Sequence, residues 1–296
     1  MSTGDGLHAA PSLDAADWLI DEGGKMGYRV SSLIPEGFDA YVRILHPADG
    51  EMLESGEPRR IAWRQVAEAH GKEIHPEVDW EDLVGHLHGD GESGEPWPDI
   101  GSLPEREHRR LAGIAAGHTS SDRYWLAWWE GFGYGPRESR PLRRRRWYAD
   151  RFKERLLKLL LSRFYRHWRW SGEEMVHVAR RDRRGRRLGD ESPSQPAYLP
   201  EGTPLFDRRG RRYGLVYSSD PLAAASYEER PIGISPQLWW PDDRSWIVAT
   251  EIDLVSTYVA CSRPLAEDLM ADDQLEAIRV ELDHSVCLDR SWWDDQ

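Results

Sequence analysis

The chain has 296 residues, 39% hydrophobic side chains and a formal net charge of −13. This length predicts one large domain or two small ones, and the apolar content excludes a globally disordered chain. The longest apolar stretch covers residues 124–129, whereas a membrane-spanning helix needs roughly 20 apolar residues, so we expect no transmembrane segment.

Charge is distributed unevenly along the chain. Residues 106–187 contain 23 Lys and Arg against 9 Asp and Glu, so the remainder is strongly acidic. An acidic majority argues against non-specific nucleic-acid binding by the whole molecule. Two cysteines and no recognisable secretory signal favour a reducing, cytoplasmic location.

The first half predicts short helices and a hairpin. A helix is expected over residues 13–22, and β-rich stretches over 29–34 and 38–45 predict a hairpin. Residues 61–70 start as a strand and continue as a helix that ends at Gly71. Pro104 opens a further helix that Gly117 closes.

The remaining elements predict the sheet. Residues 124–129 and 246–252 are apolar on both faces, which is typical of covered central strands. Further elements are a strand over 212–217, a helix over 264–270 capped by Ser262, and a strand or helix end over 275–280. We therefore expect an α+β fold with a single mixed β-sheet, flanking helices and a basic helical insertion.

The domain organisation follows from these elements. Residues 12–135 and 197–283 are expected to form two parts of one domain. Between them, residues 136–196 form a basic helical insert that ends in a flexible loop. Residues 1–11 and 284–296 are expected to be tails.

Residues 150–170 of the insert predict an amphipathic helix. A wide apolar arc lies opposite a basic face that carries Arg151, Arg155, Lys158, Arg166 and Arg169. We favour packing of the apolar arc on the same domain. The open alternatives are a protein partner or self-association, nucleic acid and a membrane surface.

The segment 239–253 is the most site-like part of the chain. Trp239 and Trp240 are candidates for an aromatic wall, and Arg244 for a ligand contact. The candidate catalytic acids are Asp242, Glu251 and Asp253. Strand alternation places the last two on one face, about 6.5–7 Å apart, where a carboxylate pair can perform acid–base chemistry. The simpler interpretation is an ion pair between Arg244 and one of these acids.

Two other motifs have weaker support. His86, His88 and Asp90 have metal-ligand spacing, but Gly91 stands where the metallo-β-lactamase zinc motif continues with another histidine, which favours a solvated loop. Residues 118–122 combine a histidine, hydroxyls and an acid, without the G-x-S-x-G elbow of a serine hydrolase. We expect no metal and no cofactor.

Three segments carry a family resemblance: PEGFDAYVRILHP (35–47), WLAWWEGFG (125–133) and SPQLWWPDDRSWIVATEID (235–253). The chain resembles a family of actinobacterial proteins without an assigned function, whose most specific mark is the block WWP-(D/E)-D-R-x-W followed by ATEID. The resemblance implies a common fold and a bacterial, cytosolic setting. It implies no activity and no catalytic residues.

Three function hypotheses follow. The first is a cytosolic bacterial binding protein, of immunity or antitoxin type. The second is a hydrolase that uses the paired carboxylates in a Trp-lined cleft. The third is docking of nucleic acid or a partner through the basic amphipathic helix.

Overall fold

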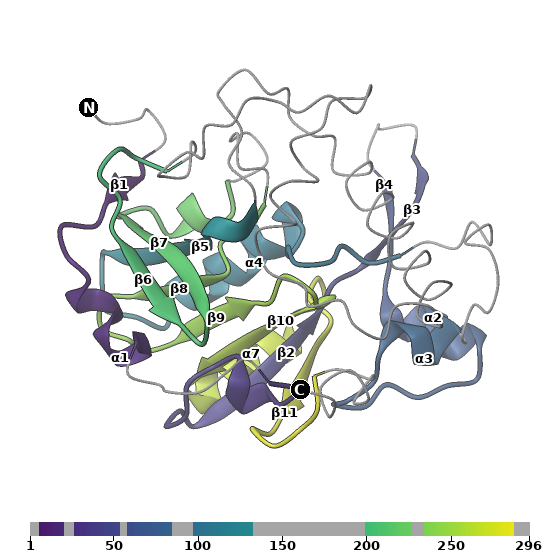
Figure 1. Ribbon diagram of the computed structural model, residues 1–296. Coiled ribbons are helices and arrows are strands. Elements are labelled where there is room, and N and C mark those ends of the chain that lie inside the picture. The colour runs from purple at the N-terminus through teal and green to yellow at the C-terminus, as the bar shows by residue number, and fades with distance from the viewer. Residues whose placement is uncertain are drawn as a thin grey trace, which may run out of the picture.

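The computed structural model describes residues 6–20, 27–53, 58–84, 97–132, 199–226 and 234–286. Its main feature is an antiparallel sheet in the order β1-β7-β5-β8-β9-β10-β2-β11, in which β6 also pairs with β7 (Figure 1). The sheet strands are β1 (His8–Ala9), β2 (Ala40–Leu45), β5 (Tyr124–Trp129), β6 (Leu205–Arg208), β7 (Arg211–Ser218), β8 (Leu238–Pro241), β9 (Ile247–Thr250), β10 (Ser256–Cys261) and β11 (Ala277–Val280).

The α+β class is confirmed, with one correction to the sheet. Within the described ranges all strand pairings are antiparallel, whereas a mixed sheet was expected. The connections explain this result, because β8, β9 and β10 are joined by short turns, whereas parallel neighbours need a crossover of a dozen or more residues. A separate ribbon pairs β3 (Ala48–Met52) with β4 (Pro58–Ile61).

The two predicted central strands lie in the middle of the sheet. β5 pairs with β7 and β8, and β9 pairs with β8 and β10. Trp246 and Val248 are buried on one face, while Ile247 and Ala249 are buried on the other, as the alternation predicts. Apolar residues on both faces are what a strand covered on two sides needs.

Helices cover each face. On what we call the α4 face, α4 (Glu105–Ala116), α7 (Arg263–Ala271) and the 3-10 turn η4 (Pro221–Ala224) pack on the sheet. On the opposite α1 face lie η1 (Asp14–Ala16), α1 (Asp17–Ile20) and η2 (Val30–Ser32). Another 3-10 turn, η3 (Glu130–Phe132), follows β5. The predicted caps hold: Ser262 accepts from the Leu265 N–H, and Gly117 ends α4.

A third, smaller cluster lies beside the main sheet. There α2 (Trp63–Ala69) and α3 (Trp80–Val84) pack together near the β3–β4 ribbon (Figure 1). The buried indoles of Trp63 and Trp80 meet edge to face, with ring centroids 5.3 Å apart. Glu276 joins this cluster to the sheet, because its carboxylate accepts hydrogen bonds from the first two backbone N–H groups of α2.

Three local predictions are wrong. The hairpin of 29–34 with 38–45 does not form, because β10 and β11 occupy both edges of β2, and residues 30–32 form η2 instead. The expected tail 1–11 contains β1, which pairs with β7. At the other end, Ser285 bridges Arg29 and Val286 is buried, so residues 285–286 belong to the folded body.

The basic helix 150–170 and the whole of the insert 136–196 lie outside the described residues. Within the described ranges, no helix combines the length and the apolar character that crossing a bilayer requires. Cys261 is a buried thiol in β10, and burial raises its pKa to about 12.

Candidate functional site

The candidate acids Glu251 and Asp253 meet a cation that was not expected. Arg211, at the start of β7, forms an ion pair with Glu251, and its second terminal nitrogen lies 3.7 Å from Asp253 Oδ2. The Arg211 guanidinium also lies over the Trp129 ring, 5.2 Å from its centroid. The two carboxylates therefore share one arginine, as members of a structural ion pair would.

Burial changes the pKa values of both Glu251 and Arg211. Only 10% of the Glu251 side chain is exposed, and burial raises its pKa above the ordinary value, which the Arg211 guanidinium offsets in part. Burial works to lower the pKa of Arg211, but the carboxylate of Glu251 raises it overall. Asp253 is half exposed and contributes less.

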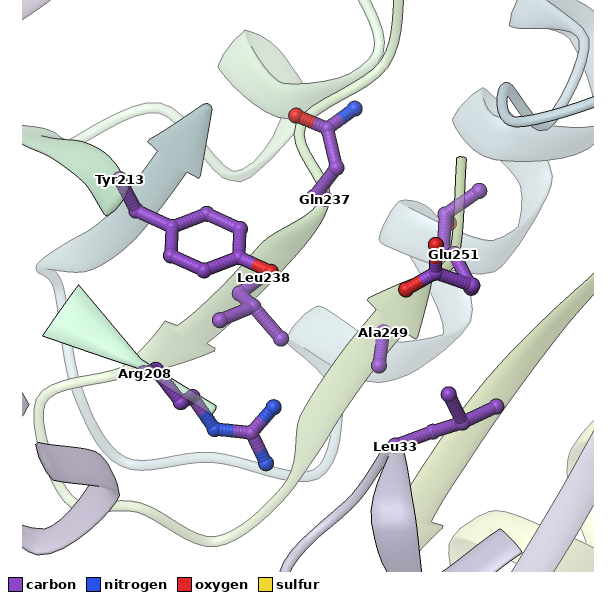
Figure 2. Close-up of a pocket in the computed structure, with 8 residues that line it drawn as sticks. Leu33, Arg208, Tyr213, Gln237, Leu238, Ala249 and Glu251 are labelled. Atoms are coloured by element: carbon purple, nitrogen blue, oxygen red, sulfur yellow. The ribbon is translucent and has the colours of Figure 1, made fainter. Parts of the chain in front are cut away.

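A small pocket adjoins Glu251 (Figure 2). Its lining includes Leu33, Arg208, Tyr213 and Leu238 on the α1 face of the sheet. Figure 2 shows the Tyr213 hydroxyl directed toward the interior of this group and the Arg208 guanidinium lying below it. The pocket has room for little more than one water molecule, so it does not fit an organic substrate.

The tryptophans expected as an aromatic wall are core residues. Trp239 and Trp240 lie in β8, and neither is exposed. Because neighbours on a strand point to opposite sides, Trp239 packs on the α4 face and Trp240 on the α1 face. The expected Trp-lined cleft is therefore wrong. Two adjacent tryptophans are also expected in a strand whose two faces are both covered, and β8 is such a strand.

Asp242 and Asp243 follow β8 in an exposed turn and have separate partners. Asp242 accepts a hydrogen bond from Trp125 Nε1 at 2.8 Å. Asp243 accepts from the hydroxyls of Thr119 and Ser120 and from backbone N–H groups. Partial burial opposes its charge, but these donors lower the pKa of Asp243 to about 2. Asp242 is thus separated from the Glu251 pair by the length of β9.

Arg244 does not form the expected ion pair with a carboxylate of the described residues. It adopts a positive φ of 54°, which turns the chain into β9, and its guanidinium lies 5.4 Å from the centroid of the Trp18 ring. The turn directs this side chain toward α1 and away from Glu251. The cation that does pair with Glu251, Arg211, is 40 residues away in sequence. In the sequence, the only feature that pointed to Arg211 was the run of arginines before the Tyr213–Val216 stretch.

Arg244 belongs to a surface that we call the aromatic–arginine surface, made of Trp18, Arg123, Trp125, Tyr217 and Arg244. Arg123 lies over two rings, 5.8 Å from Trp125 and 5.3 Å from Tyr217, whose centroids are 5.5 Å apart. The hydrogen bond between Trp125 and Asp242 connects these residues to the turn that carries Arg244. Both arginines are exposed, and Trp18 and Tyr217 are half-buried.

This surface continues at both ends. The exposed His8 ring lies 5.2 Å from Tyr217, and Trp18 contacts Phe38 and the edge of the buried Trp240. Guanidinium groups that lie on aromatic rings gain cation–π attraction, and their N–H donors can still bind a ligand. The buried Trp125 and Trp240 therefore hold this surface in place from below, while the exposed Arg123 and Arg244 present their donors to solvent.

The remaining motifs divide into two groups. His118 pairs with Asp268 at 2.7 Å, whereas Thr119 and Ser120 donate to Asp243, so no nucleophile–histidine–acid arrangement is assembled from 118–122. His86, His88 and Asp90 lie outside the described residues, as do Arg151, Arg155, Lys158, Arg166 and Arg169. Among the described residues, no group of three or more potential metal ligands occurs.

Comparison with known proteins gives no relative. No family model matches the chain, and no curated protein or solved structure matches it significantly.

Proposed function

We propose that the protein is a cytosolic bacterial binding protein that contacts a protein partner through its aromatic–arginine surface. The observation that carries this proposal is the stacking of two exposed arginines, Arg123 and Arg244, on tryptophan and tyrosine rings. Trp, Tyr and Arg are the residue types in which the binding energy of protein interfaces concentrates.

The rigidity of the surface also supports binding. Trp18 packs against Trp240, whose side chain is fully buried, and Trp125 is fixed by its hydrogen bond to Asp242. Side chains that are ordered before association lose little conformational entropy when a partner binds. A preorganised surface is compatible with an immunity- or antitoxin-like role, which we retain as the specific form of the proposal.

The hydrolase alternative has less support. Its proposed acids, Glu251 and Asp253, are bound by Arg211, and Asp242 lies at the opposite end of β9. A general acid or base must reach a substrate, and the adjoining pocket has room for little more than water. These contacts favour a structural role for the acids. Docking through the basic helix concerns residues outside the described ranges and remains a prediction.

Affinity capture with matched variants tests the proposal. The full-length protein is immobilised as wild type, as Arg244→Glu and as Arg263→Glu, and is exposed to lysate of the bacterium that encodes it. Arg263 is an exposed arginine at the start of α7, on the other face of the sheet, so its variant controls for the change of charge.

We expect a protein that is retained by the wild type and by Arg263→Glu and is lost with Arg244→Glu, and that rebinds in the same order after purification. Equal retention by all three baits would show that the aromatic–arginine surface is not the interface.

A further inference from the structure

Two of the described histidines are fully buried: His108 on the inner side of α4, and His46 against Thr257 of β10. His46 follows β2, and His108 occupies the inner side of α4 together with Leu111, Ala112 and Ala115. A buried imidazole is uncommon in an apolar interior because protonation there is costly. Protonation of a buried histidine therefore lowers the stability of the interface around it at acidic pH.

The hydrogen bonds of His46 define its neutral tautomer. Its Nδ1 lies 2.6 Å from the Asp99 carbonyl oxygen, which can only accept, so Nδ1 carries the proton. Its Nε2 then accepts from the Thr257 hydroxyl at 2.9 Å, and Thr257 in turn accepts from the Thr250 hydroxyl at 2.9 Å. Hydrogen bonds therefore run from the Thr250 hydroxyl to the Thr257 hydroxyl and from there to His46 Nε2.

This chain can accommodate a proton on His46. In the imidazolium form Nε2 becomes a donor, and the Thr257 hydroxyl can rotate to accept from it and donate to Thr250. Every contact of the chain is kept after this reversal. His46 can therefore be charged without losing its hydrogen bonds.

His108 has a different environment. Its ring lies against the indole of Trp239, with centroids 5.2 Å apart, within the apolar α4 face. Burial, and to a lesser degree the charge of His46, lower the pKa of His108 to about 3. The docked position of α4 therefore requires neutral His108, while an α4 that has moved into water regains an ordinary histidine pKa.

Other charged groups also join α4 to its neighbours. Arg110 pairs with Asp272; partial burial opposes the charge of Asp272, but the hydrogen bond from Arg110 lowers its pKa. His118 pairs with Asp268.

Glu107, the residue before His108 in α4, is directed to Arg60, 3.9 Å away, which also pairs with Asp49. Burial raises the pKa of Glu107, so it takes up a proton on acidification and favours the docked state, opposite to His108. A test must therefore isolate His108 by comparing variants.

We infer that the buried His108 makes the docking of α4 on the sheet sensitive to acid, so that α4 separates from the α4 face as His108 becomes protonated. The sign follows from linkage. The separated state binds one more proton than the docked state between about pH 3 and pH 6.5, so docking is most stable above pH 6.5 and weakens as the pH falls. This inference is independent of the proposed binding function.

Hydrogen exchange of the full chain measures this directly. The population of the open form of α4 should rise about fivefold between pH 6.5 and pH 5.5, after correction for the intrinsic exchange rate, because His108 in the open form goes from about half to about nine-tenths protonated over this interval. His108→Gln, which cannot be protonated, should show a change of less than about twofold. His70→Gln is the control, because His70 is an exposed histidine at the end of α2, outside the α4 face, and it should behave as the wild type.

An open population that does not change with pH in the wild type, or that changes equally in His108→Gln, would overturn the inference. Should His108→Gln fail to fold, an NMR titration of the wild-type imidazoles decides the question. The His108 ring should stay neutral in the folded protein at pH 5.5, and titration there with an ordinary pKa would overturn the inference.

Discussion

Arg211 and Arg244 show why the candidate site was predicted only in part. Glu251 and Asp253 were expected to share a face of an extended strand, but β9 ends at Thr250. The two acids lie in the turn that follows, which the hydrogen bond from the Leu254 N–H to the Glu251 carbonyl closes, and there they meet the same arginine. Their cation was expected at Arg244, in the turn before β9, yet it is supplied by Arg211 on β7. In the sheet, β5 and β8 lie between β7 and β9, so the approach of Arg211 to Glu251 depends on the tertiary arrangement, and local sequence carries no information on it.

The Glu251–Arg211 pair leads to a stability prediction. Glu251→Gln should lower the free energy of unfolding by about 3 kcal/mol or more, because it leaves the Arg211 charge buried without its main partner. Asp253→Asn is the matched control and should cost less than about 1 kcal/mol, because Asp253 is half exposed. Urea denaturation at neutral pH measures both. Equal losses in the two variants would contradict the assigned roles.

Gly101 provides a second test at the level of one residue. Its φ is +73°, and an added Cβ would lie 2.5 Å from the Ile252 carbonyl oxygen. Gly37 also has a positive φ, of +97°, but a Cβ added there would have no neighbouring atom within 4 Å. Gly101→Ala should therefore cost more than Gly37→Ala, for which we expect only the backbone penalty of about 1–2 kcal/mol.

Thermal denaturation of the two alanine variants gives the comparison. A Gly101→Ala variant as stable as Gly37→Ala would mean that residue 101 does not lie against Ile252 as described.

Elements with a strong local pattern were predictable from sequence. β5, α4 and α7 occur within a residue or two of their expected bounds, because an apolar strand, a proline-opened helix and a serine cap each act locally. β10 was missed, although all six of its residues are buried. Its Ser, Thr and Cys side chains do not show the apolar pattern of a central strand. Its central position comes from its pairing with β2 and β9.

The central position of β9 predicts a large effect at Trp246. This indole is fully buried and meets Trp239 edge to face, with centroids 4.7 Å apart. Trp246→Ala should cost about 3–5 kcal/mol, as for other buried large aromatics. Trp18→Ala, at a half-buried position, should cost clearly less. A loss below about 1 kcal/mol for Trp246→Ala in denaturant melts would contradict the packing of β9.

At the scale of the whole molecule, the basic insert and the folded body can be tested separately. Both faces of the sheet are covered by described helices and turns, so we expect the body to fold after residues 136–196 are replaced by a short Gly/Ser linker. Circular dichroism should then show a cooperative melt. Failure to fold would mean that the helix predicted over 150–170 supplies part of the core. A normal melt with loss of a partner would make it a docking element.

The central claim is that the aromatic–arginine surface binds a protein partner, and calorimetry with the purified captured protein tests it most directly. The Kd is measured for wild type, Trp18→Ala and Arg123→Ala, with Arg263→Ala as the matched control on the opposite face. Interface hot spots are worth about 2 kcal/mol or more, so Trp18→Ala and Arg123→Ala should each weaken binding about thirtyfold, while Arg263→Ala leaves it unchanged. Affinities within about twofold of wild type for Trp18→Ala and Arg123→Ala would contradict the claim.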